Sequence, residues 1–166
     1  MAYADHLLEQ ARHLANRETQ RPRQASLRRA VSTAYYALFH LLIHEATLNW
    51  KRADQRATLA RLFEHGKMKS ASDRQRSECN RFFNTNSTPG AELDCMRNLF
   101  IVAQAFFHSQ QQRHIADYDT SVTSVRTDVI RMIDRVESAF RSWREIREEP
   151  AAQTYLLSLL GSPRGA

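Results

Sequence analysis

Hydrophobic residues recur along most of the chain at intervals of three and four, which is the period of an α-helix. The first such segment runs from Ala2 to about Arg17, and residues 19–22 interrupt it. The second runs from about Arg23 to Asn49 without a helix breaker and is apolar on more than one side. We expect Pro22 at a first helical position and expect this second helix to be buried.

The middle of the chain, residues 51–84, is more polar than the rest. Its few apolar residues predict a short helix that ends at Gly66, a residue typical of helix C-termini. Residues 67–72 are interpreted as a loop, and residues 73–83 as another short helix. The Asn-, Thr-, Pro- and Gly-rich segment 84–90 predicts a second loop.

The second half of the chain predicts two long helices. The first spans about Ala91 to Ala116 and the second ends before Pro150. Three polar residues could cap the start of the second helix: Asp119, Thr120 and Ser121. Its apolar residues follow an a/d series over nearly four heptads: Val122, Val125, Val129, Met132, Val136, Ala139, Trp143 and Ile146.

These elements predict an all-α protein with about five main helices and no strands. One domain is expected over residues 1–149. A short amphipathic helix, Ala151–Leu160, and a mobile tail are expected within residues 150–166. The low content of Gly and Pro, four of each in 166 residues, disfavours multi-turn β folds, and no glycine-rich nucleotide-binding motif is present.

The charge of the chain points to nucleic acid or to an ordinary solvated surface. Lys and Arg number 24 against 18 Asp and Glu, giving a net charge of +6. Only Lys51, Lys67 and Lys69 are lysines, and Arg suits two-pronged phosphate contacts. Basic residues concentrate in segments 12–29 and 51–81. Such a surface attracts a phosphate backbone.

Other sequence features bear on compartment and cofactors. Cys79 and Cys95 are too few for a disulfide framework, and neither a signal peptide nor an 18-residue apolar run is found, so a cytoplasmic protein without membrane contact is expected. His40 and His44 share a helix face and could bind a metal ion, but no third ligand is evident. Polar contacts are the favoured interpretation, and no metal or other cofactor is predicted.

The segment from Arg113 to Thr120 concentrates Arg, His, Asp and Tyr where a long helix ends. Such residues suit phosphate binding and proton transfer. They also suit an ordinary helix end, because Arg113 is favourable at the negative end of the helix dipole and the aspartates can form turn contacts.

Two stretches resemble the HEPN family (higher eukaryotes and prokaryotes nucleotide-binding). Leu27–His40 resembles the S-x-A-Y-Y-A-x-F-H helix of small bacterial HEPN proteins, and Arg113–Asp119 is similar to their R-x-x-A-D-Y-D turn. With the order of helices, the resemblance covers about residues 4–147. It implies an up-and-down helical bundle that often dimerises, and many members of the family are metal-independent RNases.

The RNase motif of the family is an Arg, four to six residues, and a His. Applied to this chain, the resemblance implies Arg113 as the arginine of the motif and His114 as its polar neighbour. It implies Tyr118 as the tyrosine that often stands two residues before the His, and Thr120 stands where that His is expected. The Arg would stabilise the charged transition state and the His would transfer a proton. Threonine cannot take up a proton near neutral pH.

The function favoured on this basis is an HEPN-like protein of a toxin–antitoxin or defence system. It would bind RNA, a partner nucleotidyltransferase, or both, and its RNase motif would be degenerate. One alternative is an active endoribonuclease that uses Arg113, His114 and Tyr118. Another is a purely structural helical adaptor. We expect four arginines to contact nucleic acid: Arg113, Arg28, Arg29 and Arg81.

A homodimer is also expected, with the Arg113–Thr120 turn in its interface. The apolar second helix and the long a/d series offer more hydrophobic surface than one stripe per helix would bury. Two copies of the Arg113 turn would then form one basic cleft.

Overall fold

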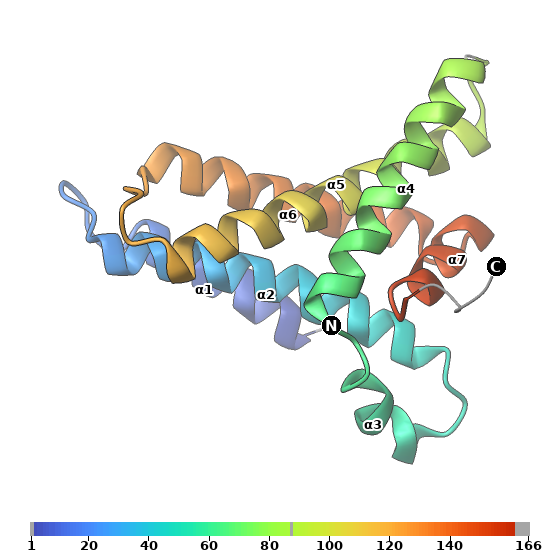
Figure 1. The fold of residues 1–166 in the computed structure, drawn as a ribbon, viewed down its shortest axis with the longest axis horizontal. Coiled ribbons are helices and arrows are strands. Elements are labelled where there is room, and N and C mark those ends of the chain that lie inside the picture. The colour runs from blue at the N-terminus through green and yellow to red at the C-terminus, as the bar shows by residue number, and fades with distance from the viewer. Residues whose placement is uncertain (1, 87, 162–166) are drawn as a thin grey trace.

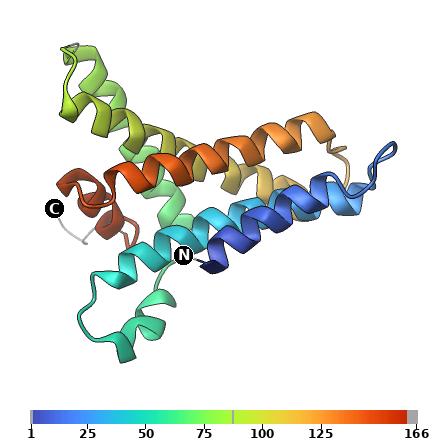
Figure 2. The same cartoon turned by 180° about the vertical axis from the view of Figure 1, so that it is seen from behind.

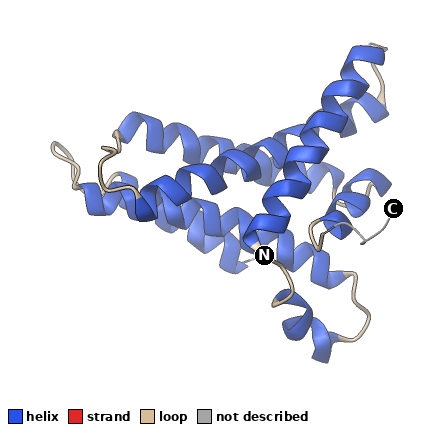
Figure 3. Cartoon of the chain, in the orientation of Figure 1, coloured by secondary structure: helices blue, strands red, loops and turns tan. Residues whose placement is uncertain are grey.

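The computed structural model describes residues 2–86 and 88–161, and every regular element in these ranges is helical (Figure 3). The predicted all-α class is therefore confirmed. Of the seven α-helices, five have 14 or more residues. The elements are α1 (Ala2–Ala15), α2 (Gln24–Leu48), the 3-10 turn η1 (Ala53–Gln55), α3 (Arg56–Ala60), α4 (His65–Thr85), α5 (Ala91–Tyr118), α6 (Arg126–Ile146) and α7 (Pro150–Ser158). The tail beyond residue 161, predicted to be mobile, lies outside the described residues.

Four long helices, α1, α2, α5 and α6, run alternately in opposite directions and form a bundle (Figures 1 and 2). The α1–α2 and α5–α6 connections lie at the same end of this bundle. Side chains join the two connections: Gln24 and Ser124 exchange hydrogen bonds of 2.9 and 2.8 Å. Arg126 donates to the carbonyl oxygens of Glu18 and Thr19. The start of α2 and the start of α6 are thus held together.

The core lies between these four helices, with α2 at its centre against α1, α5 and α6. The a/d series predicted for α6 is buried from Val129 to Ile146. Its first two members are not: Val122 and Val125 are 45% and 52% exposed, because α6 begins only at Arg126. The prediction that a residue of 119–121 caps this helix is wrong, since the cap position is Val125.

Helix α4 corrects the prediction for the middle of the chain. Residues 67–72, expected to be a loop, are helical, and Gly66 lies near the start of α4 rather than at the end of a helix. Burial explains the difference, because Met68 and Ser72 are fully enclosed and the Ser72 hydroxyl is hydrogen-bonded to that of Tyr155 at 2.8 Å. Helix α4 and the first part of α5 form a hairpin that projects beyond the bundle (Figure 1).

The prediction for Pro22 is also wrong. Pro22 precedes α2, and the cap of this helix is the next residue, so Pro22 is not at a first helical position.

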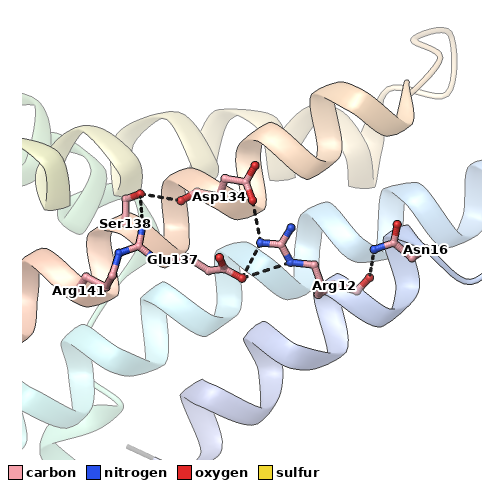
Figure 4. Close-up of polar contacts among 6 residues, drawn as sticks. All are labelled: Arg12, Asn16, Asp134, Glu137, Ser138 and Arg141. Atoms are coloured by element: carbon pink, nitrogen blue, oxygen red, sulfur yellow. Dashed lines mark hydrogen bonds and ion pairs between the residues drawn. The ribbon is translucent and has the colours of Figure 1, made fainter.

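Polar contacts join α1 to α6 on the side of the bundle that faces away from α4 (Figures 2 and 4). Arg12 of α1 forms ion pairs with Asp134 at 2.7 Å and with Glu137 at 2.6 Å. Partly exposed pairs of this kind stabilise a fold by at most about 1 kcal/mol each. Further along α6, Arg141 donates a 2.9 Å hydrogen bond to Ser138. Apolar burial therefore carries most of the stability of this contact.

No helix in the described part of the chain has both the length and the hydropathy needed to cross a lipid bilayer. Cys79 is buried and Cys95 is half-buried, and both carry free thiols. Burial raises the pKa of each thiol.

Candidate functional site

Arg113 links the last turns of α5 to the middle of α2. Its Nη2 atom donates a hydrogen bond of 3.1 Å to the hydroxyl of Tyr36. Its Nε atom lies 2.7 Å from Oδ2 of Asp117, one helical turn later, in an ion pair whose angle is not that of a hydrogen bond. The side chain of Arg113 is only 14% exposed. Its guanidinium is thus held in one orientation at the edge of the bundle.

Aromatic rings surround this guanidinium. Its central carbon lies 5.8, 5.6 and 5.7 Å from the ring centres of Tyr35, Tyr36 and Tyr118. A cation at these distances is attracted by the π-face of a ring, by about 0.5–2 kcal/mol depending on exposure. The three tyrosines therefore help to keep a positive charge in a partly desolvated place.

A second contact completes the link between α2 and α5. The hydroxyl of Ser32 donates a hydrogen bond to Oδ1 of Asp117. Ser32 and Tyr36 share one face of α2, and Arg113 and Asp117 share one face of α5, because residues four apart on a helix are neighbours. The two sequence stretches that carry the HEPN resemblance are thus in direct contact. We call Ser32, Tyr36, Arg113 and Asp117 the Arg113 cluster.

Arg28, predicted to contact nucleic acid, caps the end of α5. It donates hydrogen bonds to the carbonyl oxygens of Ala116 at 3.0 Å and Asp119 at 2.9 Å, and to that of Val122. The carbonyls of Ala116 and Asp119 lie at the negative end of the α5 dipole, where a cation is favourable, and that of Val122 lies in the connection that follows. Arg28 therefore fixes the turn beside the Arg113 cluster, a structural role that sequence reasoning missed.

The other predicted contact residues are not gathered at one point. Arg29 is exposed on α2, one residue beyond Arg28. Arg81 is exposed on the projecting hairpin, where the nearby Phe83 packs against Phe100 at 5.9 Å. Phe100 and Arg113 are about 20 Å apart along α5, at 1.5 Å per residue. Arg81 thus lies on a different part of the surface from Arg113.

His114 and Tyr118, the other two predicted catalytic residues, lie together beside the Arg113 cluster. Their ring centres are 5.0 Å apart, and Tyr118 is 66% exposed. His114 is also exposed, but it projects about 100° away from Arg113 because the two are consecutive on a helix. Thr120 is exposed in the connection that follows α5. The imidazole of His114 is therefore not aimed at the same point as the guanidinium.

A second histidine near Arg113 was not expected from the sequence. His65 is the first residue of α4, and its Nδ1 shares a hydrogen bond with the hydroxyl of Tyr35. Its ring lies 4.4 Å from that of Phe39. Burial, with the nearby Arg113 and His40, lowers the pKa of His65 below the ordinary histidine value. Its place depends on how α4 packs, so no local sequence signal marks it.

His40 and His44, the metal candidates of the sequence, border the same surface depression beside Tyr3. His40 is half-buried against the ring of Tyr3 at 5.0 Å, whereas His44 is exposed. Within residues 2–86 and 88–161, no three His, Cys, Asp or Glu side chains form a group that could hold a metal ion. The ring of His40 packs against the rings of Tyr3, Tyr36 and Phe39.

Comparison of the chain with protein-family models, with curated proteins and with solved structures finds no match in any of the three. The functional interpretation therefore rests on the residues of the site and on their chemistry.

Proposed function

We propose that this chain is an HEPN-type protein that binds RNA through the Arg113 cluster and lacks the proton-transferring histidine of an efficient RNase. One observation carries the proposal: Arg113 is held by Tyr36 and Asp117 at the contact between the two stretches that resemble the family. A cation in such a fixed orientation is suited to a phosphate group, because little entropy is lost on binding.

The donors of Arg113 are only partly used inside the protein. A guanidinium has five N–H groups. Tyr36 engages one of them and Asp117 faces another, while Nη1 donates no hydrogen bond to any described residue. A phosphate oxygen could accept from Nη1 without breaking the contact with Tyr36. The net charge of +6 favours the approach of a polyanion.

An RNA-binding assay tests this proposal. The purified protein should bind a labelled RNA with an affinity that falls as salt rises. Arg113→Ala should weaken binding at least tenfold. The matched control is Arg141→Ala, which removes the same charge from the outer face of α6 (Figure 4). Absence of RNA binding by the folded wild-type protein would contradict the proposal and favour a structural adaptor.

A second candidate function, a metal-independent endoribonuclease, is favoured by His65 rather than by His114. Its imidazole is packed against Tyr35 and Phe39, and burial, with the charge of Arg113, lowers its pKa, which favours the neutral, proton-accepting form. In this reaction Arg113 would stabilise the charged transition state and His65 would take the proton of the 2′-hydroxyl.

An RNA-cleavage assay separates the two candidates. If the protein is a nuclease, His65→Ala should reduce cleavage by about a hundredfold, the size typical of general-base loss, and Arg113→Ala should do the same. If the motif is degenerate, the wild type should be inactive and Thr120→His should generate cleavage that depends on Arg113. Equal cleavage by the wild type and His65→Ala would exclude His65 as the base.

The proposal extends to partners. A homodimer with the Arg113 turn in its interface is supported by the exposed apolar residues Val122 and Val125 in the connection that follows this turn. The surplus apolar surface expected on α2 does not support it, because α1, α5 and α6 cover that helix. A nucleotidyltransferase partner and a toxin–antitoxin or defence setting follow from the resemblance. Co-purification with neighbouring gene products tests them.

A further inference from the structure

Beside Arg113, one side of α5 carries aromatic, amide and imidazole side chains that are at least partly exposed. We call this set the α5 strip: Phe107, Gln110, Gln111, His114 and Tyr118. Its members lie three, four, seven and eleven residues from the first, so they occupy neighbouring positions on one side of the helix. At 1.5 Å per residue the strip is about 16 Å long. Its last member, Tyr118, also contacts Arg113.

Helix α4 places cations along this strip. Nζ of Lys69 lies 5.3 Å from the ring centre of Phe107, and the guanidinium carbon of Arg76 lies 4.3 Å from it. Arg76 also pairs with Asp73 at 3.3 Å. Among the described residues, no carboxylate lies within ion-pair distance of Lys69. The ammonium group of Lys69 is therefore available to an anion.

The surface between Lys69 and His114 is concave. Lys69, Ile115 and the glutamines 110–112 border, together with His114, a depression of about 570 Å³. Oε1 of Gln110, one of the bordering residues, is buried and accepts no hydrogen bond from any described residue. A buried acceptor without a partner costs about 1–3 kcal/mol.

We propose that the α5 strip binds a short single-stranded RNA segment that continues from the phosphate held at the Arg113 cluster. This inference rests on the proposed function and extends its site. Rings stack on bases, and Tyr118 and His114 present two neighbouring rings. Lys69 binds a phosphate, and the amides of Gln110 and Gln111 pair with base edges, which carry both donors and acceptors.

The chemistry of the strip selects unpaired RNA over a duplex. In an A-form helix the base faces are covered by stacking, and the base edges of the major groove are out of reach of side chains. Rings and amide groups gain little from such a surface. An unpaired strand offers both the faces and the edges of its bases. The strip should therefore prefer single-stranded RNA to a duplex of the same sequence.

Fluorescence anisotropy with a labelled eight-nucleotide RNA tests the inference. Lys69→Ala should weaken binding about fivefold or more and should reduce the slope of log K against log salt by about 0.7, the value for one phosphate contact with a single strand. The matched control is Lys51→Ala, an exposed lysine in the α2–η1 connection. Lys69→Gln keeps the length and polarity of the side chain without its charge. It should show the same loss of RNA affinity, which separates the effect of the charge from any loss of stability in Lys69→Ala.

Three outcomes distinguish this inference from the proposed function. Binding lost in both Arg113→Ala and the Lys69 variants, with Lys51→Ala unchanged, supports the strip. The strip is overturned if Arg113→Ala loses binding while the Lys69 and Lys51 variants bind with equal affinity. It is also overturned if the protein binds a duplex and a single strand with equal affinity. Either result leaves the proposed function standing. Absence of binding by the wild type overturns both.

Discussion

The hydroxyl of Tyr36 accepts a hydrogen bond from the guanidinium of Arg113, although 77 residues separate them in the sequence. The ring of the same tyrosine also faces the guanidinium at 5.6 Å. Tyr36 therefore fixes both the position and the direction of the charge that we assign to phosphate binding. The contribution of the hydroxyl can be separated from that of the ring.

Replacing Tyr36 by Phe removes the hydroxyl and keeps the ring. We expect the free energy of unfolding to fall by about 1 kcal/mol, the usual contribution of one hydrogen bond, and RNA affinity to fall about threefold or more because Arg113 loses its orientation. Urea denaturation and anisotropy measure the two effects. Tyr155→Phe is the control, since it removes a buried hydroxyl bonded to Ser72 at 2.8 Å. Equal RNA affinity of the two variants would contradict a role for Tyr36 in the site.

Arg28→Ala should loosen the turn after α5. The variant loses hydrogen bonds to three backbone carbonyls, so we expect a loss of about 2 kcal/mol of unfolding free energy. Amide hydrogen exchange should become faster in residues 117–125. The exposed neighbour Arg29 is the matched control, and Arg29→Ala should change stability by no more than about 0.5 kcal/mol. Unchanged exchange in this segment would show that Arg28 does not hold the turn.

Acid should destabilise the fold partly through His65. Burial, Arg113 and His40 lower the pKa of His65 in the folded state, so the unfolded chain takes up the proton first as the pH falls. Neutral His65 thus contributes its full stability above the pKa that it has in the unfolded chain. This contribution is lost as the pH falls through that pKa towards the lower pKa of the folded state. One proton corresponds to about 1.4 kcal/mol per pH unit at most.

His65→Gln should therefore flatten the decline of the unfolding free energy between about pH 7 and pH 5. Urea denaturation at several pH values measures the slope. His13→Gln is the comparison, because it removes an exposed histidine of α1. If the slope of unfolding free energy against pH is unchanged in His65→Gln, His65 has the same pKa in the folded and unfolded states.

Dimerisation is tested by light scattering after size-exclusion chromatography. We expect a mass of twice 19.3 kDa at micromolar concentration. Val122→Ser combined with Val125→Ser should yield the monomer, because these exposed residues are placed in the interface. Leu157→Ser is the control, since it removes an apolar side chain that is 69% exposed on α7. A mass of 19.3 kDa at every concentration would exclude the dimer and the shared cleft.

The long helices were predictable because their apolar period is regular. The all-α class and the buried series from Val129 to Ile146 follow from spacing alone. Residues 67–72 were not predictable in this way, since only Met68 and Ala71 in this polar segment are apolar, and both are buried by neighbours distant in sequence. The start of α6 was missed because its cap position, Val125, has no polar side chain that would mark it in the sequence.

The candidate site was predictable in part. Arg113, His114 and Tyr118 were identified from the turn, and Ser32 and Tyr36 lie within the other stretch that carries the resemblance. Their contacts with Asp117 and Arg113 depend on the packing of α5 on α2, which no local pattern encodes. His65 comes from a helix start that the sequence did not indicate.

The most direct measurement of the central claim is the NMR signal of the Arg113 Nε–H group during titration with short single-stranded RNA. Because this group is buried beside Asp117, its exchange with water should be slow enough for detection, and its absence from the spectrum of Arg113→Lys identifies it. The account predicts that RNA shifts this signal, that added salt reverses the shift, and that the signal of the Arg147 Nε–H group, which is also buried, stays in place. RNA that shifts the signals of other arginines and leaves that of Arg113 unchanged would contradict the account.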